Sequence, residues 1–293
     1  ASAAAAQYSD GFPAWIDGTY YVRVGSFLDS TSAQAAQASL GLTGATVAGT
    51  SGAGISVVKT GTNTVLFQFD STSGLYLAVK PGRDDTVKAE TYFRGYSYFG
   101  AFEYRRNGGD ITVVNVLSMD DYLQGVIVQE VSPSWPLEAL KAQTVCARSD
   151  AYGKLQAGKH QSQGFDLCNT TDCQAYVGIA TASDNSRRAV EETSGVYLWY
   201  NGRVADQAVY SSHNGGASES AVNVWGRDYP YLIGKIDPYE ASVVDRISNY
   251  NWTVTYTAQE LTELLQSKGY GNSTIVDFRV TKTSPTGNAI EIT

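Results

Sequence analysis

The sequence predicts an α+β protein with mixed, mostly antiparallel sheets and a few helices, opened by a small N-terminal α/β segment. Three observations support this fold class. Many short runs alternate between apolar and polar residues as half-buried strands do, turn signals built from Gly, Asn and Asp separate them, and helical periodicity is confined to a few segments. The chain has 293 residues, 43% of them hydrophobic, which is enough for two domains. We expect a leader or linker over residues 1–18, an accessory segment over 19–73 and a larger domain over 74–293.

The accessory segment reads as a strand followed by a helix. Residues 20–27 alternate as a strand does, Asp29, Ser30 or Thr31 can cap a helix, and residues 33–40 have helical spacing. Three further strand-like runs are expected, near residues 45–48, 55–60 and 64–69. This order predicts a small sheet with one helix.

Strands continue from residue 75 to residue 116, where the pattern changes. The Asn-Gly-Gly-Asp turn at 107–110 is expected to join a strand over 102–106 to one over 111–116. After Ser118 we expect a helix, with Asp120 and Asp121 supplying cap oxygens and negative charge in its first turn. Its apolar positions are Tyr122, Leu123, Val126 and Ile127.

Glu130 stands at the end of that apolar stripe. It follows Val126 by four residues and Ile127 by three, so a helix places its carboxylate on the inward face. A charge on such a face is costly, so the sequence indicates a carboxylate that is either paired in the core or tuned for chemistry.

Pro133 and Pro136 end this helix and start the next, expected over residues 136–155. Lys141 and Arg148 fall on one stripe of the second helix, near the end of the first. They are expected either to face the preceding helix or to lie on a solvated face, with Lys141 pairing Glu138.

The rest of the chain gives weaker signals. The expected elements are a helix over 187–193, a hairpin over 197–204 with an Asn-Gly turn, a strand through 208–210, a helix capped by Thr257 and Glu260 that stops at Gly269, a strand over 275–281, and a short last strand after the 285–288 turn.

Composition excludes several function classes. The formal charge of −8 argues against nucleic-acid binding, and the apolar runs are too short to span a membrane. With only 2 His and none of the common nucleotide-binding, serine-hydrolase or zinc-protease motifs, acid–base chemistry falls to carboxylates or tyrosines. The 20 Tyr suit sugar rings or a β-rich core equally well.

The 3 Cys are too few for a disulfide scaffold. Cys146 lies in a helical pattern and is expected to be a buried free thiol. Cys168 and Cys173 flank a polar loop, where they form either a local disulfide or part of a metal site.

Several motifs, in order and spacing, resemble the SpoIID/LytB family of sporulation and cell-wall proteins. They are residues 121–126 (DYLQGV), 129–143 (QEVSPSWPLEALKAQ), 165–176 (FDLCNTTDCQAY), 211–219 (SSHNGGASE), 224–226 (VWG), 230–232 (PYL) and 237–240 (DPYE). Residues 24–27 with the helix after them also resemble the start of a SPOR domain, a module that binds peptidoglycan strands lacking stem peptides.

The resemblance implies a lytic transglycosylase that cuts the MurNAc-GlcNAc backbone of peptidoglycan, with preference for peptide-free strands. Glu130 matches the family's catalytic glutamate, and an inward apolar setting would raise its pKa. No cofactor is required for that chemistry. The alternatives are a non-catalytic glycan-binding protein or amidase enhancer, partnered by a cell-wall amidase or other wall hydrolase, and a structural septal protein. For each of these we expect an extracytoplasmic location, with a signal or anchor removed before the alanine-rich start.

Matching to the family also implies residues that line a glycan groove: Lys141, Arg148, Gln174, Tyr176, Ser212, Gly215, Gly216 and Glu219, with Trp135 and Trp225 for stacking. For zinc, the family pattern has His where this chain has Asp172. A structural zinc would then use Cys168 and Cys173 with His160 or Asp172, and a Cys168–Cys173 disulfide stays open as the alternative.

Overall fold

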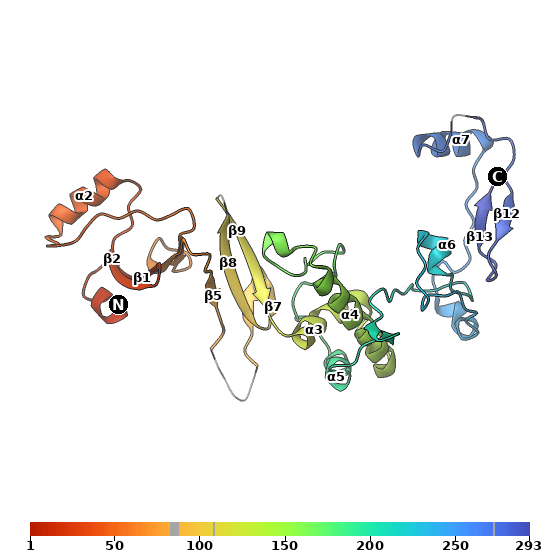
Figure 1. Ribbon diagram of the computed structural model, residues 1–293, viewed down its shortest axis with the longest axis horizontal. Coiled ribbons are helices and arrows are strands. Elements are labelled where there is room, and N and C mark those ends of the chain that lie inside the picture. Colours follow the sequence, from red (N-terminus) through yellow and green to blue (C-terminus); the bar gives the residue numbers. More distant parts are fainter. Residues whose placement is uncertain (83–87, 108, 272) are drawn as a thin grey trace. The chain divides into compact units, whose positions relative to one another are not determined.

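The computed structural model describes residues 1–82, 88–107, 109–271 and 273–293 and confirms the α+β class (Figure 1). Two compact units divide the chain. The first comprises Ala1–Leu140 and Ser162–Glu192, and the second comprises Lys141–Gln161 and Thr193–Thr293.

The first unit begins with a four-stranded sheet in the order β2-β1-β4-β3. Its elements are helix α1 (Ser2–Ala5), β1 (Gly11–Ile16), β2 (Thr19–Val24), helix α2 (Ser30–Ser39), β3 (Ile55–Val58) and β4 (Val65–Asp70). β1 pairs antiparallel with β2 and parallel with β4, where Trp15 stacks on Phe69 with ring centroids 5.1 Å apart. The strand-then-helix opening expected from the sequence is present.

Residues 1–18, expected to be a leader or linker, contribute β1 to this sheet. Phe12 and Ala14 of β1 are buried, and Asp17 and Gly18 form the turn into β2 with φ of 42° and 92°. An Asp-Gly pair at positive φ is the preferred two-residue hairpin turn, so the signal was present in the sequence.

Two other expectations for this segment need correction. The helix expected over 33–40 begins at Ser30, because the Asp29 carboxylate accepts from the backbone N–H of Ser32 at 2.8 Å. The strand expected at 45–48 does not form. Those residues are exposed and flanked by glycines, and they pair with no strand in the described part of the chain.

A second sheet in this unit has the order β5-β8-β9, from β5 (Leu77–Val79), β8 (Ala101–Asn107) and β9 (Asp110–Val116). The expected β8–β9 hairpin is confirmed by the pairing of Asn107 with Asp110, although Gly108 of its turn lies outside the described residues. A separate hairpin joins β6 (Thr91–Phe93) to β7 (Tyr96–Tyr98).

Helix α3 (Met119–Glu130) follows, and its burial explains why it forms here. Leu123, Val126 and Ile127 are fully buried, and α5 (Asp184–Glu192) contacts α3. The cap is Ser118, whose Oγ accepts from the N–H of Asp121 at 3.2 Å, whereas the sequence suggested Asp120 and Asp121. Those two acids instead supply first-turn negative charge.

The second unit contains most of α4 and several small elements after it. They are α4 (Leu137–Ala157), β10 (Trp199–Tyr200), β11 (Arg203–Val204), α6 (Ala221–Trp225), the 3-10 turns η2 (Glu240–Ser242) and η3 (Val244–Arg246), α7 (Ala258–Ser267), β12 (Val280–Thr283) and β13 (Ala289–Ile292). The turn η1 (Gln161–Gln163) spans the boundary in the sequence between the two units. The predicted capping box of Thr257 and Glu260 and the Asn-Gly hairpin turn are confirmed.

Two strands expected in this unit differ. Residues 208–210 form none, and the strand expected over 275–281 begins only at Val280, where β13 offers a partner. Ahead of it, Val276 and Phe278 are exposed, and Ile275 donates its N–H to Thr262 Oγ1 of α7 at 2.9 Å. Alternation alone therefore overestimated strand content where no partner strand was present. No helix in the described part of the chain is long and apolar enough to cross a membrane.

Candidate functional site

Glu130 is the last residue of α3, and its side chain is half-buried. Residues 121–127 of the same helix are buried, so the helix that carries Glu130 is fixed in the core. Val131 leaves the helix in an extended conformation, with its N–H donating to the carbonyl of Ile127 at 3.1 Å. The carboxyl group thus combines a rigid support with partial access to solvent.

The loop after Glu130 is built from short-range bonds. Ser132 Oγ and Ser134 Oγ are 2.8 Å apart, and the N–H of Trp135 donates to the Ser132 carbonyl at 3.1 Å. Trp135 is 44% exposed, so its ring is available at the surface, as expected for a side chain that stacks on a sugar.

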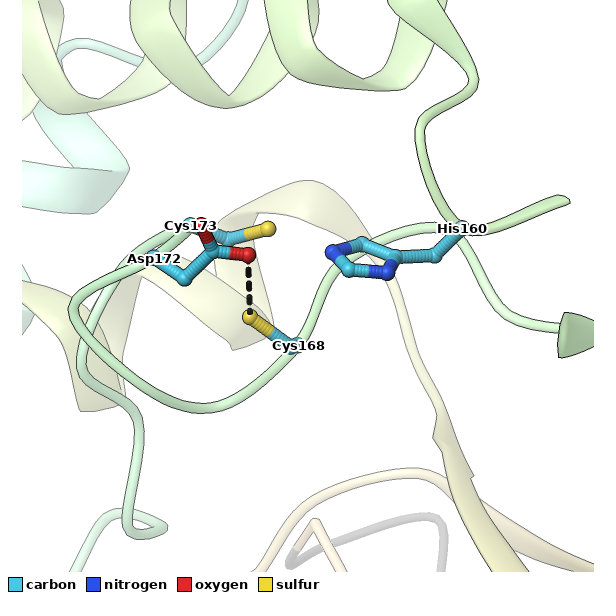
Figure 2. A group of neighbouring side chains, drawn as sticks. All are labelled: His160, Cys168, Asp172 and Cys173. Atoms are coloured by element: carbon cyan, nitrogen blue, oxygen red, sulfur yellow. Dashed lines mark hydrogen bonds between the residues drawn. The ribbon is translucent and has the colours of Figure 1, made fainter.

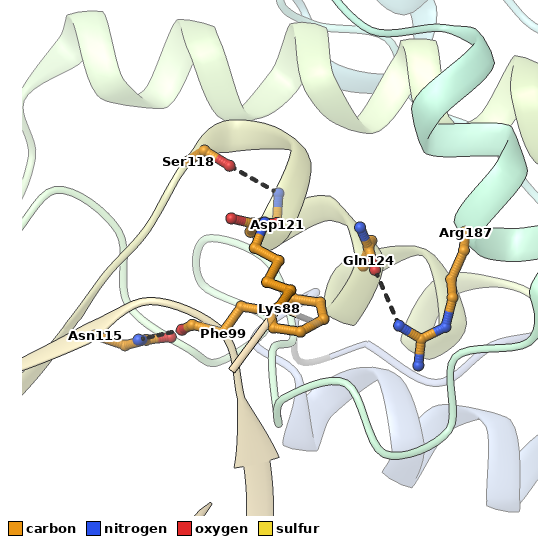
Figure 3. Close-up of polar contacts among 7 residues, drawn as sticks. All are labelled: Lys88, Phe99, Asn115, Ser118, Asp121, Gln124 and Arg187. Atoms are coloured by element: carbon orange, nitrogen blue, oxygen red, sulfur yellow. Dashed lines mark hydrogen bonds and ion pairs between the residues drawn. The ribbon is translucent and has the colours of Figure 1, made fainter. Parts of the chain in front are cut away.

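The buried polar residues of α3 have partners within the first unit (Figure 3). Asp121 forms an ion pair with Lys88, whose ammonium also lies 4.9 Å from the Phe99 ring centroid. Gln124 Oε1 accepts from Arg187 of α5 at 3.4 Å. These contacts attach the polar side of α3 to other segments of the first unit.

Gln174 and Tyr176, expected in a glycan groove, are buried. Tyr176 donates its hydroxyl proton to Asn115 Oδ1 at 2.9 Å, and its ring packs against Tyr98 and Tyr122, with centroids 5.8 and 5.0 Å away. Burial raises the pKa of the Tyr176 phenol. The structure therefore gives Tyr176 a packing role instead of a place on an open surface.

Four side chains around the cysteine loop form a group of metal-ligand type (Figure 2). His160, Cys168, Asp172 and Cys173 each offer one ligand atom, and these atoms all lie within 4.8 Å of one another. All three cysteines of the chain are free, so the alternative Cys168–Cys173 disulfide is not formed in this structure. Two thiols, an imidazole and a carboxylate at this spacing fit the tetrahedral coordination of zinc.

The thiols of this group titrate differently. Burial acts to raise the pKa of Cys168, but hydrogen bonds from Thr170 and Cys173 outweigh it and lower the pKa to about 7. Burial raises the pKa of Cys173. Cys146 on α4 was expected to be a buried free thiol; it is free and half-buried, and burial raises its pKa.

In the second unit, the stripe of α4 that carries Arg148 is buried. A solvated face had been one of the two expectations for this stripe. Thr144, Arg148 and Ala151 are buried, and Arg148 donates to Thr193 Oγ1 and to the Val196 carbonyl, both at 3.3 Å. Lys141 is half-buried. A guanidinium at this depth is stabilised by such acceptors, and it holds α4 to the segment that follows Thr193.

Two acidic side chains accept hydrogen bonds from the loop that carries Ser212, Gly215 and Gly216. The buried Glu240 carboxylate accepts from the N–H groups of Asn214 and Gly215 at 2.7 and 2.8 Å. Asp237 accepts from the Asn214 amide at 3.0 Å. Ser212 and Gly215 are exposed on this loop, which leaves them accessible to a ligand. The sequence motif included Glu240, but only the structure shows its role.

Glu219, predicted to bind glycan, joins two segments of the second unit. Its carboxylate accepts from the Asn223 amide at 2.8 Å and from Thr286 and Asn288 at 3.0 Å. Hydrogen bonds from Ser284, Asn223, Ser220 and Asn288 lower the pKa of Glu219. Trp225, 58% exposed at the end of α6, keeps a ring at the surface.

Comparison with protein families agrees with this arrangement of motifs. The model of the SpoIID family, described as stage II sporulation protein, matches residues 107–200, which include α3, Glu130 and the cysteine loop. Residues 107–200 of the chain are thus similar to the SpoIID family. The predicted SpoIID resemblance is thereby confirmed.

Three curated relatives show the same resemblance. The chain is 41% identical over 139 residues to an amidase enhancer of Bacillus subtilis (strain 168), covering 47% of this chain and 17% of that protein. It is 26% identical over 175 residues to stage II sporulation protein D of the same organism, covering 55% and 50%. An uncharacterized protein of Brachyspira hyodysenteriae is 37% identical over 140 residues, or 48% and 38%. The chain thus spans half or less of the length of these relatives.

Proposed function

We propose that this protein is a peptidoglycan lytic transglycosylase in which Glu130 is the general acid and then the general base. The observation that carries the proposal is the placement of Glu130. It is a half-buried carboxyl at the end of a helix fixed in the core, inside the segment that matches the family.

The chemistry needs one carboxyl group. Glu130 gives its proton to the glycosidic oxygen as the bond to the MurNAc C1 breaks, which frees the next sugar as the leaving group. The resulting carboxylate takes the proton from the C6 hydroxyl of the same MurNAc, and the C6 oxygen bonds to C1. The product is a 1,6-anhydro end, Glu130 regains its proton, and no water is consumed. Hydrolytic glycosidases use a pair of carboxyls for the corresponding reaction.

The surroundings suit a sugar polymer. Trp135 lies five residues after Glu130 with its ring exposed, and aromatic faces stack on sugar rings. The second unit, taken by itself, also exposes a hydroxyl at Ser212 and a ring at Trp225, which are groups of the kind that contact sugars. The substrate we propose is the extracytoplasmic glycan strand, with preference for strands free of stem peptides.

A structural zinc is part of the proposal. Cys168, Cys173, His160 and Asp172 would hold it, and zinc would supply a cross-link for the loop that leads into the buried residues Gln174 and Tyr176. None of the steps assigned to Glu130 depends on it.

The test compares wild type with Glu130→Gln on purified denuded glycan strands. Glu130→Gln keeps the size of the side chain but cannot donate a proton as an acid, so we expect at least about 100-fold less product. Glu138→Gln is the matched control, since this exposed glutamate stands in the same motif, in the first turn of α4. Equal product release from Glu130→Gln and wild type would refute the role of Glu130.

A second candidate function is stimulation of a cell-wall amidase without glycan cleavage. It is favoured by the 41% identity to a protein named amidase enhancer. If wild type releases no anhydro product, yet wild type and Glu130→Gln increase the activity of a purified cell-wall amidase equally, this second function replaces the first.

A further inference from the structure

The first turn of α5 is closed by two serines. Ser183 precedes the helix, and its Oγ accepts from the N–H of Ser186 at 3.1 Å, while Ser186 Oγ accepts from the N–H of Ser183 at 2.9 Å. This reciprocal pair satisfies N–H groups that the start of a helix leaves without partners. Ser186 is fully buried.

Ser183 makes one more hydrogen bond, to a residue outside α5. A serine hydroxyl has a single proton to donate, and Ser183 donates it to the carbonyl of Pro133 at 3.1 Å, across a sequence separation of 50 residues. Pro133 is the third residue after Glu130. The capping residue of α5 is therefore also bonded to the loop in which α3 ends.

A second contact between the same elements lies farther along both helices. Arg187, four residues after Ser183, donates to Gln124 in the middle of α3 (Figure 3). Residues at the start of α5 are thus bonded to α3 before Glu130, at Gln124, and to the loop after Glu130, at Pro133. All of these residues belong to the first unit.

We propose that Ser183 is a positioning residue for Glu130, acting through its hydrogen bond to the Pro133 carbonyl. The inference rests on the proposed function for its consequence in catalysis. Short-range bonds among Ser132, Ser134 and Trp135 shape the loop but do not attach it to the rest of the unit. The bond from Ser183 attaches it, and displacement of a reacting group by about 1 Å can cost up to about 100-fold in rate.

The geometric part is tested by hydrogen–deuterium exchange of the peptide covering residues 131–136. Ser183→Ala removes the donor, so amide exchange in this peptide should become about 10-fold faster, because opening of the loop no longer breaks that bond. Ser183→Thr keeps a hydroxyl and should exchange like wild type.

Ser186→Ala is the matched control for the cap. It removes the partner of Ser183 within α5 but leaves the donor to Pro133 in place, so exchange should rise in the first turn of α5 and stay unchanged over residues 131–136. Unchanged exchange over 131–136 in Ser183→Ala, or equal acceleration in Ser186→Ala, would overturn the proposal whether or not the protein cleaves glycan.

The catalytic part is tested with glycan strands. Ser183→Ala should lower kcat about 10-fold with KM unchanged, and Ser183→Thr should restore it. A loss of folded protein alone would lower the active fraction and would be detected by titrating folded material. If exchange changes as expected but wild type forms no anhydro product, the proposed function fails and the positioning geometry stands. If wild type is active and Ser183→Ala keeps its kcat, the positioning role in catalysis is refuted.

Discussion

At the scale of single residues, carboxylates that look alike in the sequence have different roles in the structure. Glu130 is half-buried at a helix end, Glu219 receives hydrogen bonds from two separate segments, and Glu240 holds two backbone N–H groups. Sequence reasoning could find Glu130, because its spacing from Val126 and Ile127 is local. It could not assign the other two, since Glu240 accepts from N–H groups 25 and 26 residues away and Glu219 also accepts from Thr286 and Asn288, 67 and 69 residues away.

Glu219 predicts a pH dependence of stability. The pKa of Glu219 is lowered in the folded protein, mainly by the hydrogen bond from Ser284. Its stabilising contribution is therefore fully present above the unfolded pKa of about 4.3 and is lost as the pH falls toward the lower folded value. Urea unfolding should show that Glu219→Gln has a lower free energy of unfolding than wild type at pH 7. This difference in free energy should become smaller as the pH is lowered.

Glu263→Gln is the control for this prediction. Glu263 is an exposed residue of α7 that accepts one hydrogen bond, from Gln259 at 2.9 Å. The free energy of unfolding of Glu263→Gln should differ little from that of wild type at every pH. A Glu219→Gln gap that stays constant between neutral and acid pH would contradict the account.

The cysteine loop predicts metal binding. Reduced protein should bind about one equivalent of zinc per chain, since two thiols, an imidazole and a carboxylate satisfy tetrahedral zinc. Replacing Cys168 or Cys173 by Ser should remove most of this binding, and Cys146→Ser should not. Absence of bound zinc in reduced wild-type protein, measured by elemental analysis after dialysis, would refute the metal site.

At the scale of elements, burial decided which sequence signals became structure. The α3 and α4 patterns, the capping box and the Asn-Gly hairpin were all predictable, because propensity and periodicity agreed there. The strands expected at 45–48 and 208–210 failed because alternation needs a paired neighbour, which a single sequence does not show. β1 was missed although its Asp-Gly turn was visible.

Gly125 shows how an element depends on its neighbours. Glycine within a helix costs about 1 kcal/mol relative to alanine, yet a Cβ at Gly125 would lie 2.5 Å from Tyr176 Cε2 and 2.6 Å from the Gly178 carbonyl oxygen. Gly125→Ala should therefore lower the free energy of unfolding by about 1–3 kcal/mol, against the helix preference.

The control for Gly125→Ala is Gly52→Ala, at an exposed site where a Cβ would meet no atom within 4 Å. It should change the free energy of unfolding by less than about 0.5 kcal/mol. A Gly125→Ala protein that is as stable as wild type, or more so, would show that the Tyr176 segment does not pack on α3 as described.

At the scale of the whole molecule, the segment similar to the SpoIID family contains the carboxyl group proposed for catalysis, that of Glu130. The segment that matches the family includes β9, α3 with Glu130, α4, the cysteine loop and α5, which contacts α3. The division into two compact units was not visible in the sequence, because it depends on contacts between segments far apart in the chain. The anionic chain also gave no indication of a partner beyond the exclusion of nucleic acid.

Mass spectrometry of the products formed from denuded glycan strands tests the central claim most directly. A 1,6-anhydro end and a hydrolysed end differ by one water, so the mass identifies the reaction without further assumptions. The account predicts anhydro-MurNAc ends from wild type and their loss in Glu130→Gln, with Glu138→Gln unaffected. Products that carry the extra water, or anhydro ends formed equally by Glu130→Gln, would contradict it.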